Sequence, residues 1–141
     1  MVMLQRFHKY DRDRIAAAVR AAEAETTGQI VVTLSPWFWG SAEAMADRAF
    51  KKLGIARTKD RNGVLIFVCP RKRTAVIRGD EGIHAHAGQQ LWDDAVAAIA
   101  GAAAIDLTAG IVRAIELVGA RLVERFPARG PHENELPDRP V

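Results

Sequence analysis

Two short loops of this 141-residue chain carry the side chains best suited to bind a metal ion. Asp60 and Asn62 stand just before one apolar run, and Asp80 and Glu81 stand just after the next one. Carboxylate and amide oxygens are hard ligands of the kind that calcium and magnesium prefer. Glycines flank both loops, so the backbone there can bend sharply and aim these oxygens at one point. The four residues are therefore a candidate site for Ca²⁺, or for Mg²⁺.

The two apolar runs must pair for these loops to meet. Residues 63–69 and 73–78 are aliphatic and β-branched, and only a short turn separates them, which predicts an antiparallel hairpin. The register expected from a turn of that length places Asn62 opposite Asp80, with roughly 5 Å between paired residues. A helix beginning near His84 would point its N-terminus at the same place, where it could hold a phosphate oxygen.

Ordinary turn chemistry is the alternative explanation of these loops. Asn-Gly and Gly-Asp pairs are common in turns, and Asp80 or Glu81 could simply cap the following helix. Arg61 stands between the ligands of the first loop and could offset their charge without a metal. His84 and His86 would point about 200° apart on a helix, so they would not share an ion. Arg61 and His84 are kept as parts of a possible binding surface.

Three adjacent aromatic residues, Trp37, Phe38 and Trp39, follow the first predicted strand. Three neighbouring side chains cannot all face one core, so we expect at least one of them to be exposed. An exposed aromatic side chain in a loop indicates a contact surface. A local cap over the end of the sheet is the alternative.

The chain lacks the motifs of common hydrolases and phosphoryl-transfer enzymes. It contains no Walker loop, no GxGxxG and no HExxH, and its two serines form no nucleophile elbow. The turn after Cys69 is too short for the phosphate-cradling loop of a cysteine phosphatase, so a buried free cysteine is expected. The net charge is only +3 and aromatic residues make up 6%, so nothing indicates a nucleic-acid partner.

The apolar spacing predicts an α/β domain. It indicates helices over 11–26, 41–53, 84–100 and 106–126, and strands over 29–35, 63–69 and 73–78. Strands alternating with helices predict a three-layer α/β/α sandwich with about four helices and a small mixed sheet of three to four strands. The fourth strand would lie near Trp37 to Trp39.

A single domain over residues 1–141 is expected, with a proline-rich C-terminal tail from 127 to 141. The start of the chain does not look like a signal peptide. Charged residues interrupt the most apolar stretch, so we expect no transmembrane segment. These features predict a cytoplasmic protein, and they leave attachment to a membrane-associated partner open.

The order of these pieces resembles the TPM domain family, named for a thylakoid lumen protein, a photosystem repair protein and a receptor modulator. The match spans nearly the whole chain and rests on order and spacing rather than on one specific motif. It is carried by Ala22-Glu23, Thr27 to Val32, Ala49-Phe50, Leu53-Gly54, Arg61 to Ile66, Gly79 to His84, Gly88, Trp92, Gly110-Ile111, Ile115 and Asn134 to Pro137.

This resemblance implies an α/β/α sandwich with a shallow site at one end of the sheet, where some members bind a divalent cation. Some plant members are described as acid phosphatases, whereas a protein-interaction or envelope-associated role is implied for bacterial members. This chain is similar to the short, soluble bacterial type. Its Asp60-Arg61-Asn62-Gly63 differs from many exported members, which have Asp directly before Asn-Gly, so one carboxylate is displaced by a residue.

Two functions remain as hypotheses. The first is a non-catalytic protein-interaction module, dependent on a divalent cation and associated with envelope or membrane partners. The alternative is a metal-assisted phosphatase acting on phosphomonoesters, in which the cation would polarise a phosphoryl oxygen and activate water. The absence of a nucleophile beside a general base favours the first.

Overall fold

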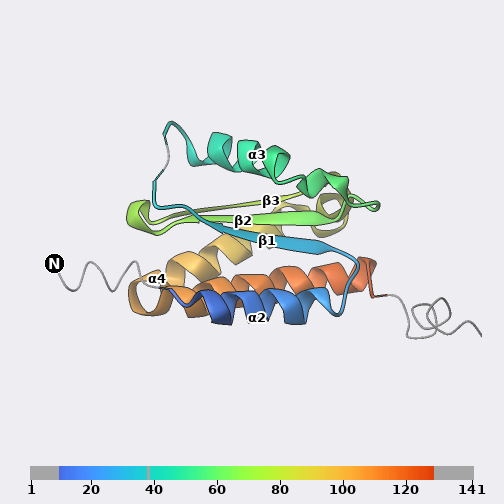
Figure 1. Ribbon diagram of the computed structural model, residues 1–141. Helices are drawn as coiled ribbons and strands as arrows, with labels where there is room; N and C mark the ends of the chain where they lie inside the picture. Colours follow the sequence, from blue (N-terminus) through green and yellow to red (C-terminus); the bar gives the residue numbers. More distant parts are fainter. Residues whose placement is uncertain (1–9, 38, 129–141) are drawn as a thin grey trace, which may run out of the picture.

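A computed structural model describes residues 10–37 and 39–128 of the chain. A three-stranded sheet lies between helix α3 on one face and helices α2 and α4 on the other (Figure 1). The described elements in chain order are α2 (Arg12–Glu23), β1 (Gln29–Leu34), α3 (Ala42–Lys52), η1 (Ile55–Arg57), β2 (Gly63–Cys69), η2 (Pro70–Lys72), β3 (Thr74–Gly79) and α4 (Glu81–Arg125).

The sheet is mixed, in the order β1-β2-β3, with β1 parallel to β2 and β2 antiparallel to β3. The predicted hairpin is confirmed, but its predicted register is wrong by one residue. The 3-10 turn η2 is followed by Arg73 in a left-handed conformation (φ 50°), so Cys69 pairs with Thr74. As a result Asp80 lies opposite Gly63, to whose carbonyl it donates its N–H at 2.9 Å, and not opposite Asn62.

The central strand β2 divides the core into two halves. Its residues alternate between the faces, as a strand requires. Val64, Ile66 and Val68 face α2 and α4, whereas Leu65, Phe67 and the free cysteine Cys69 face α3. All seven β2 residues are buried, which explains the uninterrupted apolar run in the sequence.

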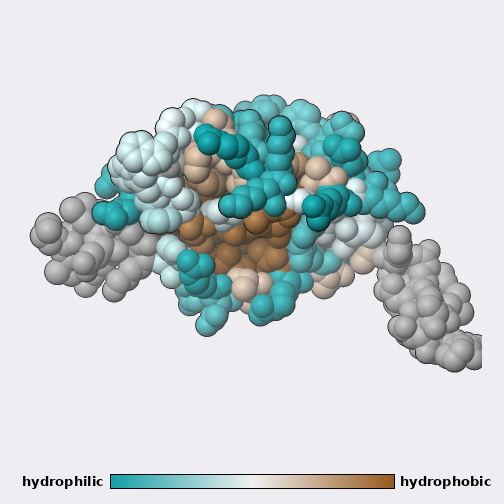
Figure 2. Space-filling view, turned by 45° about the horizontal axis from the view of Figure 1, so that its top comes forward, coloured by the Kyte–Doolittle hydropathy of each residue, from teal (hydrophilic) through white to brown (hydrophobic). Residues whose placement is uncertain are grey.

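Strand β1 forms one edge of this sheet. Only Ile30 is buried there, while Val31, Val32 and Leu34 are half-buried. Figure 2 views the molecule from the β1 side and shows an apolar hollow bordered by hydrophilic residues. The Ile30 N–H donates to Glu23 Oε2 at 2.7 Å, so a charged side chain blocks the start of the edge.

The described residues contain three helices, not about four. The two last helices expected from the sequence form the single element α4. Its backbone leaves the helical region at Gly88 (φ 73°) and at Asp106 (φ −152°). Figure 1 shows that α4 reverses direction, so that residues 89–105, after the break at Gly88, and residues 107–125 form two arms that run in opposite directions. Asp106 accepts the N–H of Ala109 at 3.0 Å, so it caps the second arm although the element continues through it.

Helix α4 is the one helix in the described part of the chain that is long and apolar enough to cross a membrane, with a mean hydropathy of 2.0 over 18 residues. This assignment rests on length and composition alone, and it is weak evidence for a membrane span because core helices of soluble proteins meet the same criterion. One third of that stretch is buried in the fold.

The predicted starts of α2 and α3 are confirmed, and a polar side chain caps each of them. Asp11 accepts the N–H groups of Asp13 and Arg14 at 3.0 and 3.1 Å, and Ser41 accepts that of Ala44 at 3.1 Å. The sheet has three strands within the described residues, and the loop at Trp37 and Trp39 adds none. The tail expected from residue 127 begins inside the fold, because Pro127 bridges Thr26.

Replacing Ile66 by alanine should lower the free energy of unfolding by about 2–5 kcal/mol, because Ile66 is fully buried between β1, β3 and the α2–α4 layer. Ile66→Val should cost only about 0.5–1.5 kcal/mol. Urea unfolding of both variants measures these losses. An alanine variant as stable as the parent would place Ile66 outside the core.

Candidate functional site

The turn over residues 58–62 organises the open end of the β2–β3 hairpin. Arg61 has a left-handed backbone (φ 51°), and its carbonyl accepts the N–H groups of Gly82 at 2.9 Å and Ile83 at 3.3 Å. The Thr58 hydroxyl accepts the N–H of Asn62 at 3.0 Å, which holds the turn closed. The first turn of α4 is thus seated directly on this loop.

Asp80 and Glu81 lie beside Arg61. Arg61 donates to both oxygens of Asp80, with Nε at 2.8 Å and Nη2 at 3.3 Å, and its Nη1 is 3.8 Å from Glu81 Oε1. The hydrogen bond that Arg61 donates to Asp80, followed by the charges of Asp80 and Glu81, raises the pKa of Arg61. Asp80 Oδ1 also caps α4 by accepting the N–H of Glu81 at 2.8 Å. Both oxygens of the buried Asp80 are therefore engaged within the protein.

Asp60 and Asn62 face a different space, a cleft of about 410 Å³ that we call the Asn62 cleft. Asn62 is 1% exposed, and its Nδ2 donates to Thr27 Oγ1 at 3.1 Å. Its Oδ1 is buried and has no hydrogen-bond partner among the described residues. The cleft is lined by Glu23, Ala24, Thr26, Thr27, Thr58, Lys59, Asp60, Asn62 and Ala128.

A second cleft of about 400 Å³ shares Thr27 and Asp60 with the first. Neither Asp80 nor Glu81 lines either cleft. The four residues proposed as metal ligands therefore lie at one end of the fold but form two pairs. The first pair faces a cleft, and the second is bound to Arg61.

Glu23 and Thr27 were not among the predicted site residues. Their place depends on the parallel pairing of β1 with β2, which sets Gln29 opposite Gly63 and so brings the residues preceding both strands together. Glu23 is fixed there by the bond from the Ile30 N–H. The signal in the sequence was the position of Glu23 at the end of a helix directly before a strand.

The described residues contain no group of three or more His, Cys, Asp or Glu side chains that could hold a metal ion. His84 lies in the first turns of α4, where its Nδ1 accepts the indole N–H of Trp92 at 2.8 Å. His86 is 3.1 Å from Glu124 on the second arm of α4. The two histidines thus point to different partners.

The N-terminus of α4 is already satisfied by the protein. The N–H of Glu81 bonds to Asp80 Oδ1, those of Gly82 and Ile83 to the Arg61 carbonyl, and that of His84 to the Asp80 carbonyl. The first four N–H groups of a helix are the ones that bind anions. The helix end expected to hold a phosphate oxygen therefore has none of these donors left to offer.

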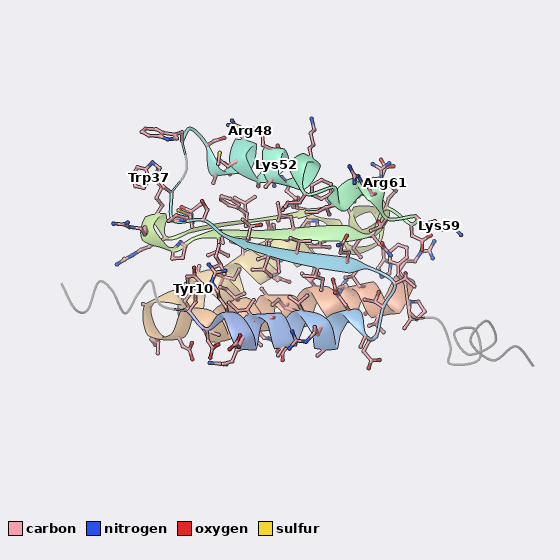
Figure 3. All side chains as sticks on the ribbon, viewed as in Figure 1. Tyr10, Trp37, Arg48, Lys52, Lys59 and Arg61 are labelled. Atoms are coloured by element: carbon pink, nitrogen blue, oxygen red, sulfur yellow. The ribbon has the colours of Figure 1, made fainter. Side chains whose placement is uncertain are left out.

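The aromatic loop lies at the opposite end of the sheet from Lys59 and Arg61 (Figure 3). Trp37 is 50% exposed and Trp39 is 78% exposed, which confirms that at least one of the three aromatic side chains is exposed. Phe38 lies outside the described residues. The loop and the Asn62 cleft are therefore two separate surfaces.

Replacing Gly82 by alanine should destabilise the protein by about 1–3 kcal/mol, because an added Cβ would lie 2.2 Å from the Asp60 carbonyl oxygen. Gly101→Ala is the matched control, since a Cβ at Gly101 meets nothing within 4 Å and should stabilise the helix by up to about 1 kcal/mol. Thermal melts compare the two. Equal stability of both variants would mean that α4 does not rest on the turn.

Residues 5–121 match the TPM domain family. The chain is 32% identical to the BA42 protein of the psychrophilic bacterium Bizionia argentinensis, whose NMR structure superposes with a TM-score of 0.77 over 85% of this chain and 86% of that one.

The N-terminal domain of the cg2496 protein from Corynebacterium glutamicum shares the fold. It is 21% identical, with a TM-score of 0.62 over 84% of this chain and 74% of that one. No match is found among curated proteins. The extent of the family match establishes that the chain belongs to the TPM domain family.

Proposed function

We propose that this TPM domain is a non-catalytic protein-interaction module whose Asn62 cleft binds a divalent cation, calcium in preference to magnesium. The observation that carries the proposal is the buried Oδ1 of Asn62, which has no partner among the described residues although the side chain lines the cleft. An unsatisfied buried acceptor costs about 1–3 kcal/mol. A bound cation would remove that cost.

The donor set suits a hard cation. The residues that line the cleft carry the Asn62 amide oxygen, the carboxylates of Asp60 and Glu23, and the hydroxyls of Thr27 and Thr58. No residue of the described structure forms a salt bridge with either carboxylate. These groups come from two separate loops, and calcium tolerates such irregular ligand geometry better than magnesium does.

A bound cation would tie together segments distant in the sequence. Glu23 and Thr27 flank the loop between α2 and β1, whereas Thr58, Asp60 and Asn62 form the turn that seats α4. Cation binding would therefore order one contiguous end of the molecule. We expect a protein partner, attached to the membrane or envelope, to recognise that ordered end.

The alternative is a metal-assisted phosphatase. Its expected phosphate seat at the start of α4 is filled by internal hydrogen bonds. The residues lining the Asn62 cleft include no histidine, cysteine or serine, and in our proposal its threonines and carboxylates serve as cation ligands. Hydrolysis of phosphomonoesters should accordingly stay at background with calcium or magnesium present. A metal-dependent rate that Asp60→Asn abolishes would establish the alternative.

Millimolar calcium should raise the melting temperature by several degrees relative to chelator, because a ligand at about 100 times its Kd stabilises the folded state by about 2.7 kcal/mol. Asp60→Asn should abolish the shift, since it removes a charged ligand from the cleft. Magnesium should give a smaller shift. Differential scanning fluorimetry of the full chain measures all of these.

Glu81→Gln is the matched control, because it makes the same carboxylate-to-amide change on the side of the loop that faces Arg61. It should leave the calcium shift intact. No shift in the parent would refute the proposal. A shift that Glu81→Gln abolishes and Asp60→Asn preserves would move the cation to the Arg61 side.

A further inference from the structure

Large hydrophobic side chains are exposed at the end of the molecule opposite the Asn62 cleft. Ile105 is 92% exposed, Trp39 is 78% exposed and Trp37 is 50% exposed. Leu53, at the end of α3, is the other exposed large hydrophobic residue of the described chain. We call the surface formed by Trp37, Trp39, η2 and the turn of α4 at Asp106 the tryptophan end.

Ring contacts and a shared pocket connect these parts from Trp39 to Ala104, the residue before Ile105. The rings of Trp37 and Trp39 meet edge to face with centroids 6.2 Å apart. The Lys72 ammonium lies 4.4 Å from the Trp37 ring centroid, which joins the aromatic loop to η2. The same η2 turn and the tip of α4 together line an apolar pocket of about 360 Å³, to which Pro70 and Ala104 contribute.

The tip of α4 is apolar where a soluble helix is usually polar. Residues 95–105 contain only alanine, valine, isoleucine and glycine, with no polar side chain. Part of this stretch packs on the core, but Ala97, Ala100, Ala104 and Ile105 are exposed. The outward face of this stretch is therefore apolar, although its side chains do not pack in the core of the described structure.

The charge of this end is also distinctive. Arg71, Lys72 and Arg73 follow one another without an acidic neighbour in the turn. Asp106, next to Ile105, is already used as a helix cap and lies 3.9 Å from Arg14. Basic residues and exposed tryptophans are thus combined with a protruding aliphatic tip.

We propose that the tryptophan end binds the surface of an anionic lipid bilayer. Trp37, Trp39 and Ile105 enter the boundary between headgroups and acyl chains, where tryptophan is enriched. The basic η2 turn contacts lipid phosphates, at about 1 kcal/mol for each basic residue near the surface. Two copies facing each other through this end would bring their basic turns together, so the charge favours lipid over a second copy.

Attached in this way, the protein would lie on the membrane surface rather than span the bilayer. The reversal at Asp106 turns the apolar tip of α4 into a shallow protrusion, since both arms return into the fold (Figure 1). Lys59, which lines the Asn62 cleft, lies at the other end of the sheet from Trp37 (Figure 3), so the cleft would face away from the bilayer. The proposal does not require a cation in that cleft.

Co-sedimentation with phosphatidylcholine vesicles, with and without phosphatidylglycerol, tests whether the tryptophan end binds anionic lipid. A chelator is present throughout, so that no divalent cation takes part. The full chain should bind only the anionic vesicles, and binding should weaken as salt rises. Ile105→Asp and Arg71→Glu should each weaken binding by about fivefold or more, because each removes one of the two attractions.

Leu53→Asp and Arg48→Glu are the matched controls, since they make the same changes on α3. They should bind like the parent, and thermal melts confirm that all four variants fold. Absence of binding to anionic vesicles overturns the proposal, as does an equal loss in the controls. A dimer in sedimentation velocity that Ile105→Asp disperses, without vesicle binding, would make this end an interface between copies.

Discussion

The left-handed turn at Arg61 is the constraint on which this end of the molecule depends. Its carbonyl accepts two N–H groups from the first turn of α4, while its guanidinium holds both oxygens of Asp80, the cap of the same helix. One residue thus fixes the start of a 45-residue element that covers one face of the sheet together with α2. Gly82 is required beside it, because the Asp60 and Arg61 carbonyls occupy the space of a side chain.

The same interaction divides the acidic residues by role. Arg61 forms a salt bridge with Asp80 and lies close to Glu81, so these two acidic residues stabilise the fold. Asp60 and Asn62, on either side of Arg61, are turned into the Asn62 cleft, where Glu23 and Thr27 join them from the α2–β1 loop. The cation ligands that we propose, Asp60 and Asn62, are therefore the immediate neighbours of Arg61, which together with Asp80 forms the Arg61–Asp80 clamp. The tryptophan end is separated from both by the length of the sheet.

Local patterns in the sequence were enough for the strands, the starts of α2 and α3 and the hairpin, since each depends on near neighbours. The predicted register of the β2–β3 hairpin was wrong because the left-handed conformation of Arg73 lengthens the turn by one residue. The arginine side chain gives no sign of that backbone conformation in the sequence. The join of two predicted helices into α4 was missed because Asp106 caps the second arm while the chain continues. Glu23 and Thr27 were missed because the parallel β1–β2 pairing that places them is non-local.

The central claim is that the orphaned oxygen of Asn62 marks a cation site distinct from the Arg61–Asp80 clamp. A calcium titration followed by ¹⁵N–¹H NMR tests it residue by residue. The Asn62 side-chain amide and the backbone amides of Thr27 and Asp60 should shift in a saturable way, while the indole resonances of Trp37 and Trp39 stay unchanged. Shifts confined to Glu81 and its neighbours, or no saturable shift at Asn62, would contradict the account.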